Sequence, residues 1–165
     1  MKTPTVLRIT QGAMIAALYV CLTYVSAFFG LSSGAIQLRL SEALCILAAF
    51  TPAAVWGLPL GCALANALTG CLFWDVVFGS LATFLGALVA RLLRKLPFWV
   101  HPLPNVFFNT LIVPFVLVWV YGVPEGLPYL FLTVGIGEIL SCQVLGMLLY
   151  PVLDKRRMVL GFDSK

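Results

Sequence analysis

The stretch ITQGAMIAALYVCLTYVSAFFG, residues 9–30, decides the fold class of this chain, because it contains no charged side chain. A helix needs about 20 apolar residues to cross the hydrocarbon core of a bilayer, and this run is long enough to do so. Residues 1–11 lack the short apolar core and cleavage site of a signal peptide, so we expect the run to remain in the protein. We interpret it as the first membrane helix.

The composition extends this interpretation to the whole chain. Of its 165 residues, 62% are hydrophobic and 10% are charged, whereas a soluble domain is roughly half apolar and a quarter charged. We therefore expect an all-α integral membrane protein of the cell membrane, with residues 1–165 forming a single multi-pass domain. The net charge of +4 does not indicate a nucleic-acid partner, because the basic residues form small groups at segment ends rather than a stripe.

Charges, prolines and glycines divide the chain into six apolar segments, and we predict that each forms a transmembrane helix. The predicted segments are 9–29, 36–50, 53–72, 76–93, 104–121 and 127–150. The break at Thr51 and Pro52 separates the second segment from the third, because one helix of that combined length would be too long for a hydrocarbon layer about 30 Å thick.

The basic residues predict the orientation of these six segments. Short cytoplasmic loops collect Lys and Arg, and with six spans all the basic groups fall on one side of the membrane. These groups are Lys2 and Arg8; Arg91, Arg94 and Lys95; and Lys155, Arg156 and Arg157. We therefore predict that both termini are cytoplasmic. The loops containing Ser32 and Ser33, residues 73–75 and residues 124–126 are then expected to face outward.

The cysteines and the histidine give no indication of a metal site, a cofactor or a disulfide framework. The five cysteines include no C-x-x-C pair, and His101 is the only histidine. We interpret the cysteines as packing residues.

Glu138 is the most unusual polar residue, because the predicted last helix places it near the middle of the membrane. A carboxylate at that depth is costly and is expected to face the protein interior, where such residues usually serve function. Gly135, Ser141 and Cys142 share its helix face and are small, which predicts room for a pocket. The alternative is a structural Glu, hydrogen-bonded between helices, or glycine-mediated helix packing.

Arg39 and Glu42 occur in IQLRLSEAL, residues 36–44, within an otherwise apolar segment. If this segment is helical, the two side chains are one turn apart and can bond to each other. The pair could be an interfacial anchor, with Arg39 reaching outward, or the lining of a recess for a small polar solute. The spacing alone does not decide between these two interpretations.

Several other polar residues lie in the predicted helices. Asp75 is suited to capping the fourth helix, and Asn66 needs a partner from another helix or from a ligand. Asn105 and Asn109 share a face near the cytoplasmic side, and we interpret both as structural.

Small residues also form a stripe on the first helix. Gly12, Ala13, Ala16 and Ala17 form overlapping small-x-x-x-small pairs, which allow another helix to approach closely. The stripe could pack against the sixth predicted helix of this chain or against a partner.

Taken together, five stretches resemble the queuosine-precursor transporter family, whose members are substrate-binding S components of energy-coupling factor transporters. The stretches are GAMIAALYVCLTY, IQLRLSEAL, FTPAAVWGLPLGCALANAL, WDVVFGSLATFLGAL and VGIGEILSCQVLG. The resemblance covers nearly the whole chain. It implies a six-helix protein that captures a 7-deazaguanine, such as queuine or an aminomethyl or cyano precursor, on the outer side of the membrane.

The resemblance also implies a partner, an energy-coupling module made of one transmembrane coupling protein and two ATPases. Ala13 and Ala17 match the alanine stripe by which S components meet that module. A guanine-like ligand offers adjacent N–H donors for a carboxylate, an exocyclic oxygen for Arg or Asn, and a flat ring for an aromatic side chain. The candidate binding residues are Arg39, Glu42, Asn66, Trp74, Asp75 and Glu138.

Other functions are less well supported. The chain contains no G-x-x-x-x-G-K-[ST] motif, so it cannot hydrolyse ATP through a P-loop and would need a partner for energy. An intramembrane enzyme is not indicated, because the single histidine has no suitable nucleophile or metal-ligand set. An S component for another nutrient and a non-transporting assembly subunit remain alternatives.

Overall fold

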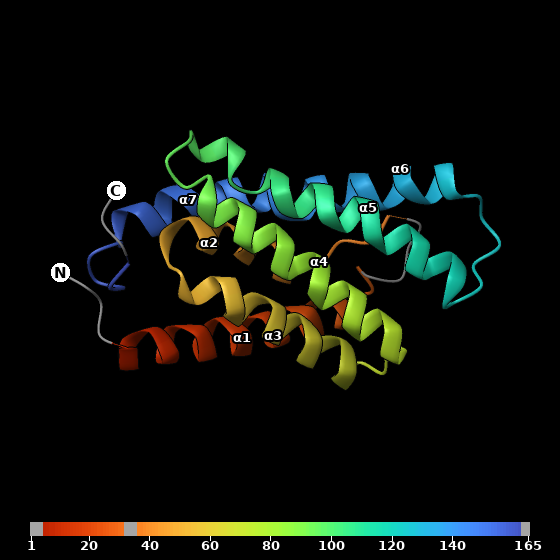
Figure 1. The fold of residues 1–165 in the computed structure, drawn as a ribbon, viewed down its shortest axis with the longest axis horizontal. Helices are drawn as coiled ribbons and strands as arrows, with labels where there is room; N and C mark the ends of the chain where they lie inside the picture. Colours follow the sequence, from red (N-terminus) through yellow and green to blue (C-terminus); the bar gives the residue numbers. More distant parts are fainter. Residues whose placement is uncertain (1–4, 32–35, 163–165) are drawn as a thin grey trace.

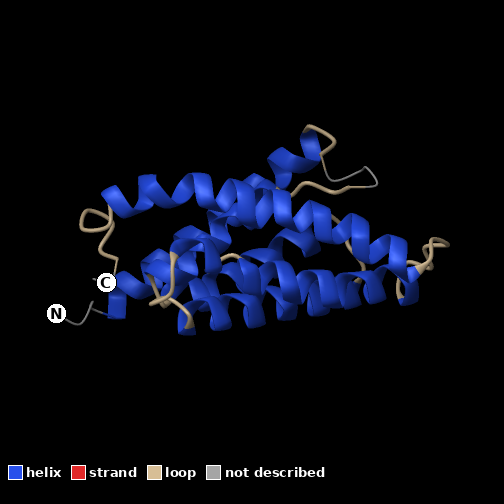
Figure 2. Ribbon diagram, turned by 90° about the horizontal axis from the view of Figure 1, so that it is seen from above, coloured by secondary structure: helices blue, strands red, loops and turns tan. Residues whose placement is uncertain are grey.

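The computed structural model describes residues 5–31 and 36–162, and every regular element in these two ranges is a helix. Lys2, Ser32 and Ser33 lie outside the described residues. The elements in chain order are α1 Thr5–Phe28, η1 Leu40–Ile46, α2 Leu47–Phe50, α3 Ala53–Leu68, α4 Phe73–Leu92, η2 Phe98–Val100, α5 Leu103–Trp119, α6 Leu127–Glu138, η3 Ile139–Leu145 and α7 Gly146–Lys155. The long helices run along one common axis (Figures 1 and 2). The all-α prediction is therefore confirmed for this part of the chain.

Four helical segments are long and apolar enough to cross a membrane, namely Thr5–Phe28, Phe73–Leu92, Phe98–Trp119 and Leu127–Lys155. They correspond to the first, fourth, fifth and sixth predicted segments, with different ends. In particular, α4 begins at Phe73 rather than at residue 76, so residues 73–75 form its first turn instead of an outer loop. The last segment continues to Lys155, beyond its predicted end at residue 150.

The second and third predicted segments are shorter than expected. The third, α3, ends at Leu68 instead of residue 72, because the chain turns at Gly70, whose φ is 80°. In the second, Arg39 is extended, with φ −110° and ψ 104°, and a 3-10 helix, η1, follows before the short α2. The prediction of one regular helix over residues 36–50 is therefore wrong.

Side chains from two other elements stabilise the extended backbone of the second segment. The amide of Leu40 donates to Ser26 Oγ in α1 at 2.8 Å, and the amide of Arg39 donates to Ser141 Oγ in η3 at 3.0 Å. An extended residue advances about 3.3 Å and a 3-10 residue about 2.0 Å, against 1.5 Å in an α-helix. The segment therefore covers a long distance along the bundle with few residues.

Helices α1 and α3 pack closely through glycines. A Cβ atom at Gly57 would lie 2.7 Å from the carbonyl oxygen of Gly12, and one at Gly61 would lie 3.0 Å from Cα of Ala16. The small residues Gly12 and Ala16 are thus buried against α3, which excludes the interpretation that the stripe packs on the last helix. Ala13 and Ala17 lie on the adjacent, exposed side of α1.

The first turn of α1, the end of α4 and the end of α7 lie at the same end of the bundle, on the left in Figure 1. Gln11 Nε2 in α1 also donates to the carbonyl oxygen of Leu160, in the segment that follows α7, at 2.9 Å. The described basic residues that predict the topology are located on these elements or in the turns that directly follow α4 and α7, so they gather at one end. The opposite end carries the loops that precede α4 and α6.

Candidate ligand-binding site

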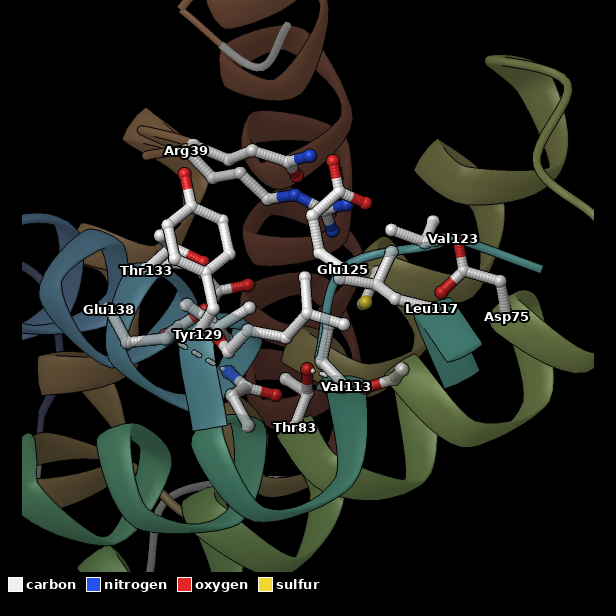
Figure 3. A pocket seen from close by; sticks show the side chains of 17 residues that line it. Arg39, Asp75, Thr83, Val113, Leu117, Val123, Glu125, Tyr129, Thr133 and Glu138 are labelled. Atoms are coloured by element: carbon white, nitrogen blue, oxygen red, sulfur yellow. Dashed lines mark hydrogen bonds between the residues drawn. The ribbon is translucent and has the colours of Figure 1, made fainter. Parts of the chain in front are cut away.

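A cavity of about 210 Å³ lies between the extended segment before η1 and helices α3, α4, α5 and α6 (Figure 3). A second space of about 400 Å³ extends toward α1 and shares five lining residues with the first, namely Gln37, Arg39, Asp75, Leu117 and Val123. Together the two adjoining spaces are in the range of small-molecule sites, roughly 300–1,000 Å³. The ionisable and amide side chains lining the first cavity are Gln37, Arg39, Glu42, Asp75, Asn109, Glu125, Tyr129 and Glu138, and Cys62 lines it as well.

Glu138 is the last residue of α6 and lines the cavity, where the π-helical η3 begins. Its Oε2 accepts hydrogen bonds from Asn109 Nδ2 at 3.2 Å and from Cys142 Sγ at 3.2 Å. Single-turn π segments are rare and occur frequently at functional sites. Because Asn109 binds this carboxylate and also lines the cavity, the interpretation of Asn109 as merely structural and remote from the site is not supported.

The cavity does not lie on the helix face of Gly135, Ser141 and Cys142, where these small residues predicted room for a pocket beside Glu138. Gly135 faces α5, where an added Cβ would lie 3.4 Å from Cγ2 of Thr110. Ser141 is buried and binds the amide of Arg39, as described above, and neither Gly135 nor Ser141 lines the cavity. The cavity is instead on the side of α6 that presents Leu130, Thr133 and Val134.

Glu42 is buried in η1, with 2% of its surface exposed, and it lines the cavity. Its Oε1 accepts a hydrogen bond from the hydroxyl of Tyr19, and its Oε2 accepts one from Cys45 Sγ at 3.2 Å. Burial of this kind excludes a role for Glu42 as an anchor at the membrane interface.

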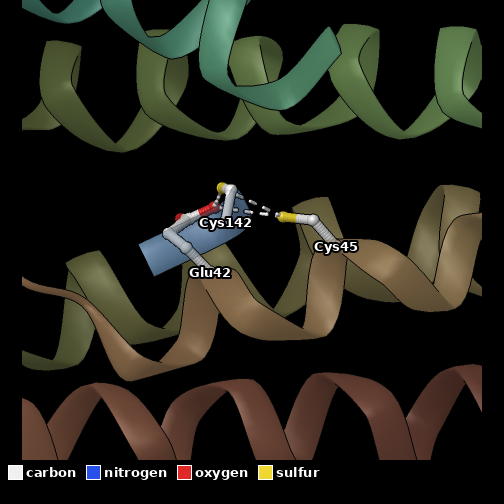
Figure 4. Close-up of side chains that lie close together, drawn as sticks. All are labelled: Glu42, Cys45 and Cys142. Carbon is white, nitrogen blue, oxygen red and sulfur yellow. Dashed lines mark hydrogen bonds between the residues drawn. The ribbon is translucent and has the colours of Figure 1, made fainter. Parts of the chain in front are cut away.

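Cys142 brings Glu42 and Glu138 into one polar network. Its thiol lies 3.7 Å from Glu42 Oε2 and 3.9 Å from Cys45 Sγ (Figure 4). Glu42, Cys45 and Cys142 have the donor types of a zinc site, with ligand atoms within 4.8 Å of one another. The carboxylate oxygens already accept hydrogen bonds from the protein, so the cluster is satisfied without an ion. All five cysteines are free, and Cys45 and Cys142 are network members rather than simple packing residues.

The side chains of Arg39 and Glu42 do not bond to each other in the described part of the chain, because Arg39 is extended and precedes the helical turn that contains Glu42. The guanidinium instead lines both cavities, where Nη1 lies 3.5 Å from Asn66 Oδ1. Asn66 is fully buried in α3 and lines the second cavity. Of the two interpretations of Arg39 and Glu42, this arrangement favours the lining of a recess.

Asp75 lines both cavities from the first turn of α4, which brings it close to the α5–α6 loop. Its Oδ2 accepts a hydrogen bond from the hydroxyl of Tyr121 at 2.9 Å, and that hydroxyl accepts one from the amide of Leu72 at 3.2 Å. No side-chain cap closes the start of α4, so the capping interpretation of Asp75 is not supported.

Trp74 lies apart from the other predicted binding residues. It is 55% exposed, stacks on Phe78 with ring centroids 5.9 Å apart, and lines neither cavity. The aromatic side chain that lines the first cavity is Tyr129, near the start of α6. Glu125, which the sequence marked only as part of an outward loop, also lines it.

Comparison with known proteins assigns the chain to a transporter family. The model of the family described as QueT transporter matches residues 9–155. The chain is also 34% identical over 113 residues to a queuosine precursor transporter QueT of Lactococcus lactis subsp. cremoris (strain MG1363). That alignment spans 66% of this chain and 66% of the length of the relative. No solved structure matches the chain. The chain therefore belongs to the QueT transporter family, a family of multi-pass membrane transporters rather than enzymes.

Proposed function

We propose that this chain binds a 7-deazaguanine queuosine precursor and acts as the substrate-binding S component of an energy-coupling factor transporter. The observation that carries the proposal is the cavity in which the carboxylates of Glu42 and Glu138 and the guanidinium of Arg39 line the same space. Family membership and the name of the relative, a queuosine precursor transporter, support the choice of ligand.

The groups around the cavity suit the edges of a guanine-like base. The ring nitrogen and the exocyclic amine donate two adjacent N–H bonds, which one carboxylate, Glu138 or Glu42, can accept together. The exocyclic oxygen needs donors, and Arg39 and Asn109 supply them. Tyr129 offers an aromatic face next to these groups.

Binding is tested by titrating the purified protein with queuine, the aminomethyl and cyano precursors, and guanine. We expect at least one deazaguanine to bind more tightly than guanine. If none of the four compounds binds, the proposal is wrong, and an S component for another nutrient or an assembly subunit becomes the better interpretation.

We propose six membrane passes with both termini in the cytoplasm. The gathering of the described basic residues at one end of the bundle supports this orientation. With this orientation, the open side of the cavity lies near the outer surface.

Cysteines introduced at Glu125 and Arg94 should react with a membrane-impermeant reagent from outside and from inside, respectively. The parent protein measures the background from its own cysteines. Internal reaction at Glu125 would refute the orientation.

The exposed side of α1 is the proposed contact with the coupling module. Ala13 and Ala17 form a smooth exposed strip on which another helix could approach closely, while their neighbours Gly12 and Ala16 are already used by α3. Without a nucleotide motif, the chain would depend on that module for energy.

Replacing Ala13 and Ala17 together by Leu should weaken co-purification of the coupling protein several-fold and leave ligand affinity unchanged. Bulky side chains would separate the two helices, whereas the cavity is lined by other elements. Ala67→Leu is the matched control, since Ala67 is an exposed alanine on α3. Normal assembly and uptake in the double variant would assign Ala13 and Ala17 to lipid contact alone.

A further inference from the structure

The first cavity is lined by more acidic than basic side chains. Four carboxylates line it, those of Glu42, Asp75, Glu125 and Glu138, against one guanidinium, that of Arg39. A neutral base whose N–H donors occupy one carboxylate leaves the others without a charge partner in a confined space, which is unfavourable. A ligand that carries a positive charge reduces that imbalance.

Glu125 differs from the other three carboxylates because it has no protein partner within the described residues. Glu42 accepts from Tyr19, Asp75 from Tyr121, and Glu138 from Asn109. Among residues 5–31 and 36–162, Glu125 has no hydrogen-bond or ion-pair partner; it is exposed and extends from the α5–α6 loop into the cavity (Figure 3). Its carboxylate is therefore available to a ligand and lies where the cavity meets solvent.

We infer that the site selects a 7-deazaguanine whose side arm carries an ammonium group, and that the Glu125 carboxylate accepts hydrogen bonds from that ammonium. This inference rests on the proposed function and specifies its substrate class. The aminomethyl precursor and queuine carry an aliphatic amine, which is protonated at neutral pH as the side chain of lysine is. The cyano precursor has a neutral nitrile at the same position, which accepts hydrogen bonds but brings no positive charge.

The selectivity for the amine over the nitrile depends on which part of the ligand meets which carboxylate. The ring of either ligand satisfies a buried carboxylate in the same way, so the ring does not distinguish the two ligands. The arm does, because an ammonium donates charge-assisted hydrogen bonds to Glu125, whereas the nitrogen of a nitrile presents a lone pair to the same carboxylate. Repulsion between Glu125 and the nitrile nitrogen thus adds to the attraction between Glu125 and the ammonium, and both favour the amine.

The experiment compares the aminomethyl and cyano precursors, which differ only in the arm. Isothermal titration of the purified wild-type protein at low ionic strength should show at least roughly tenfold tighter binding of the amine. In Glu125→Gln the affinity for the amine should fall about three- to tenfold, and the affinity for the nitrile should stay within twofold. The ratio of the two affinities should therefore be smaller than in the wild-type protein. Raising the salt concentration should narrow the wild-type preference as well.

Asp154→Asn is the matched control, because it also turns a carboxylate into an amide but lies in α7, outside the residues that line the cavity. It should leave both affinities unchanged. Equal wild-type affinity for amine and nitrile would overturn the inference and leave the proposed function standing. An equal loss for both ligands in Glu125→Gln, or no loss for either, would overturn the assignment of Glu125. Failure of every deazaguanine to bind would overturn the inference and the proposed function together.

Discussion

The variant Glu138→Gln is expected to bind the best deazaguanine ligand roughly ten- to a hundredfold more weakly than the wild-type protein. Glutamine keeps the size of the side chain and an acceptor for Asn109 Nδ2, but it removes the charge and replaces one acceptor oxygen by a donor. A pair of N–H donors on the ligand would then lack one acceptor in a confined site. Such a loss costs about 1–3 kcal/mol, and each 1.4 kcal/mol is a factor of ten in affinity.

The measurement is a titration of each purified variant, after a melting curve has shown that it is folded. Asp154→Asn again controls for the loss of a carboxylate away from the cavity. Asn109→Ala should have a smaller effect than Glu138→Gln, because Asn109 orients the carboxylate and contributes only one donor of its own. Wild-type affinity in Glu138→Gln would show that this carboxylate is structural and would move the binding role to Glu42.

The sequence predicted the parts of the fold that depend on hydropathy. Apolar runs of membrane length placed α1, α4, α5 and the last helical segment within a few residues, because the bilayer imposes a minimum length on such runs. It did not predict the extended conformation before η1. That conformation is stabilised by Ser26 and Ser141, which are distant in sequence, and no local pattern marks them as its partners.

The candidate site was predicted in part for the same reason. Charged side chains in apolar segments are costly, so Arg39, Glu42 and Glu138 could be identified without a structure, and all three line the cavity. Asn109 and Glu125 could not be identified in this way, because an asparagine on a helix and a glutamate in a loop are common. They reach the cavity only because α5 and the loop after it pack against α6. Trp74 was chosen for its chemistry, and the early start of α4 leaves it exposed.

Gly57 is expected to tolerate no larger side chain, because α1 and α3 are packed closely at this position. In Gly57→Ala the new methyl group would lie 2.7 Å from the carbonyl oxygen and 3.0 Å from Cα of Gly12. Both atoms are backbone, so neither can rotate away, and α1 and α3 must separate. Overpacking of this kind costs typically 1–3 kcal/mol, so we expect the melting temperature in detergent to fall by several degrees.

Gly126→Ala is the matched control for this change. Gly126 has a negative φ of −65°, and a Cβ there would meet only Pro128 Cδ at 3.8 Å, so this variant should melt like the wild-type protein.

The α1–α3 contact also determines which side of α1 is left exposed, since Gly12 and Ala16 pack against α3. Gly57→Ala should therefore weaken assembly with the coupling protein as well as stability, because it shifts the helix that carries Ala13 and Ala17. An unchanged melting temperature in Gly57→Ala would show that the two helices are not held at this short distance in the membrane protein.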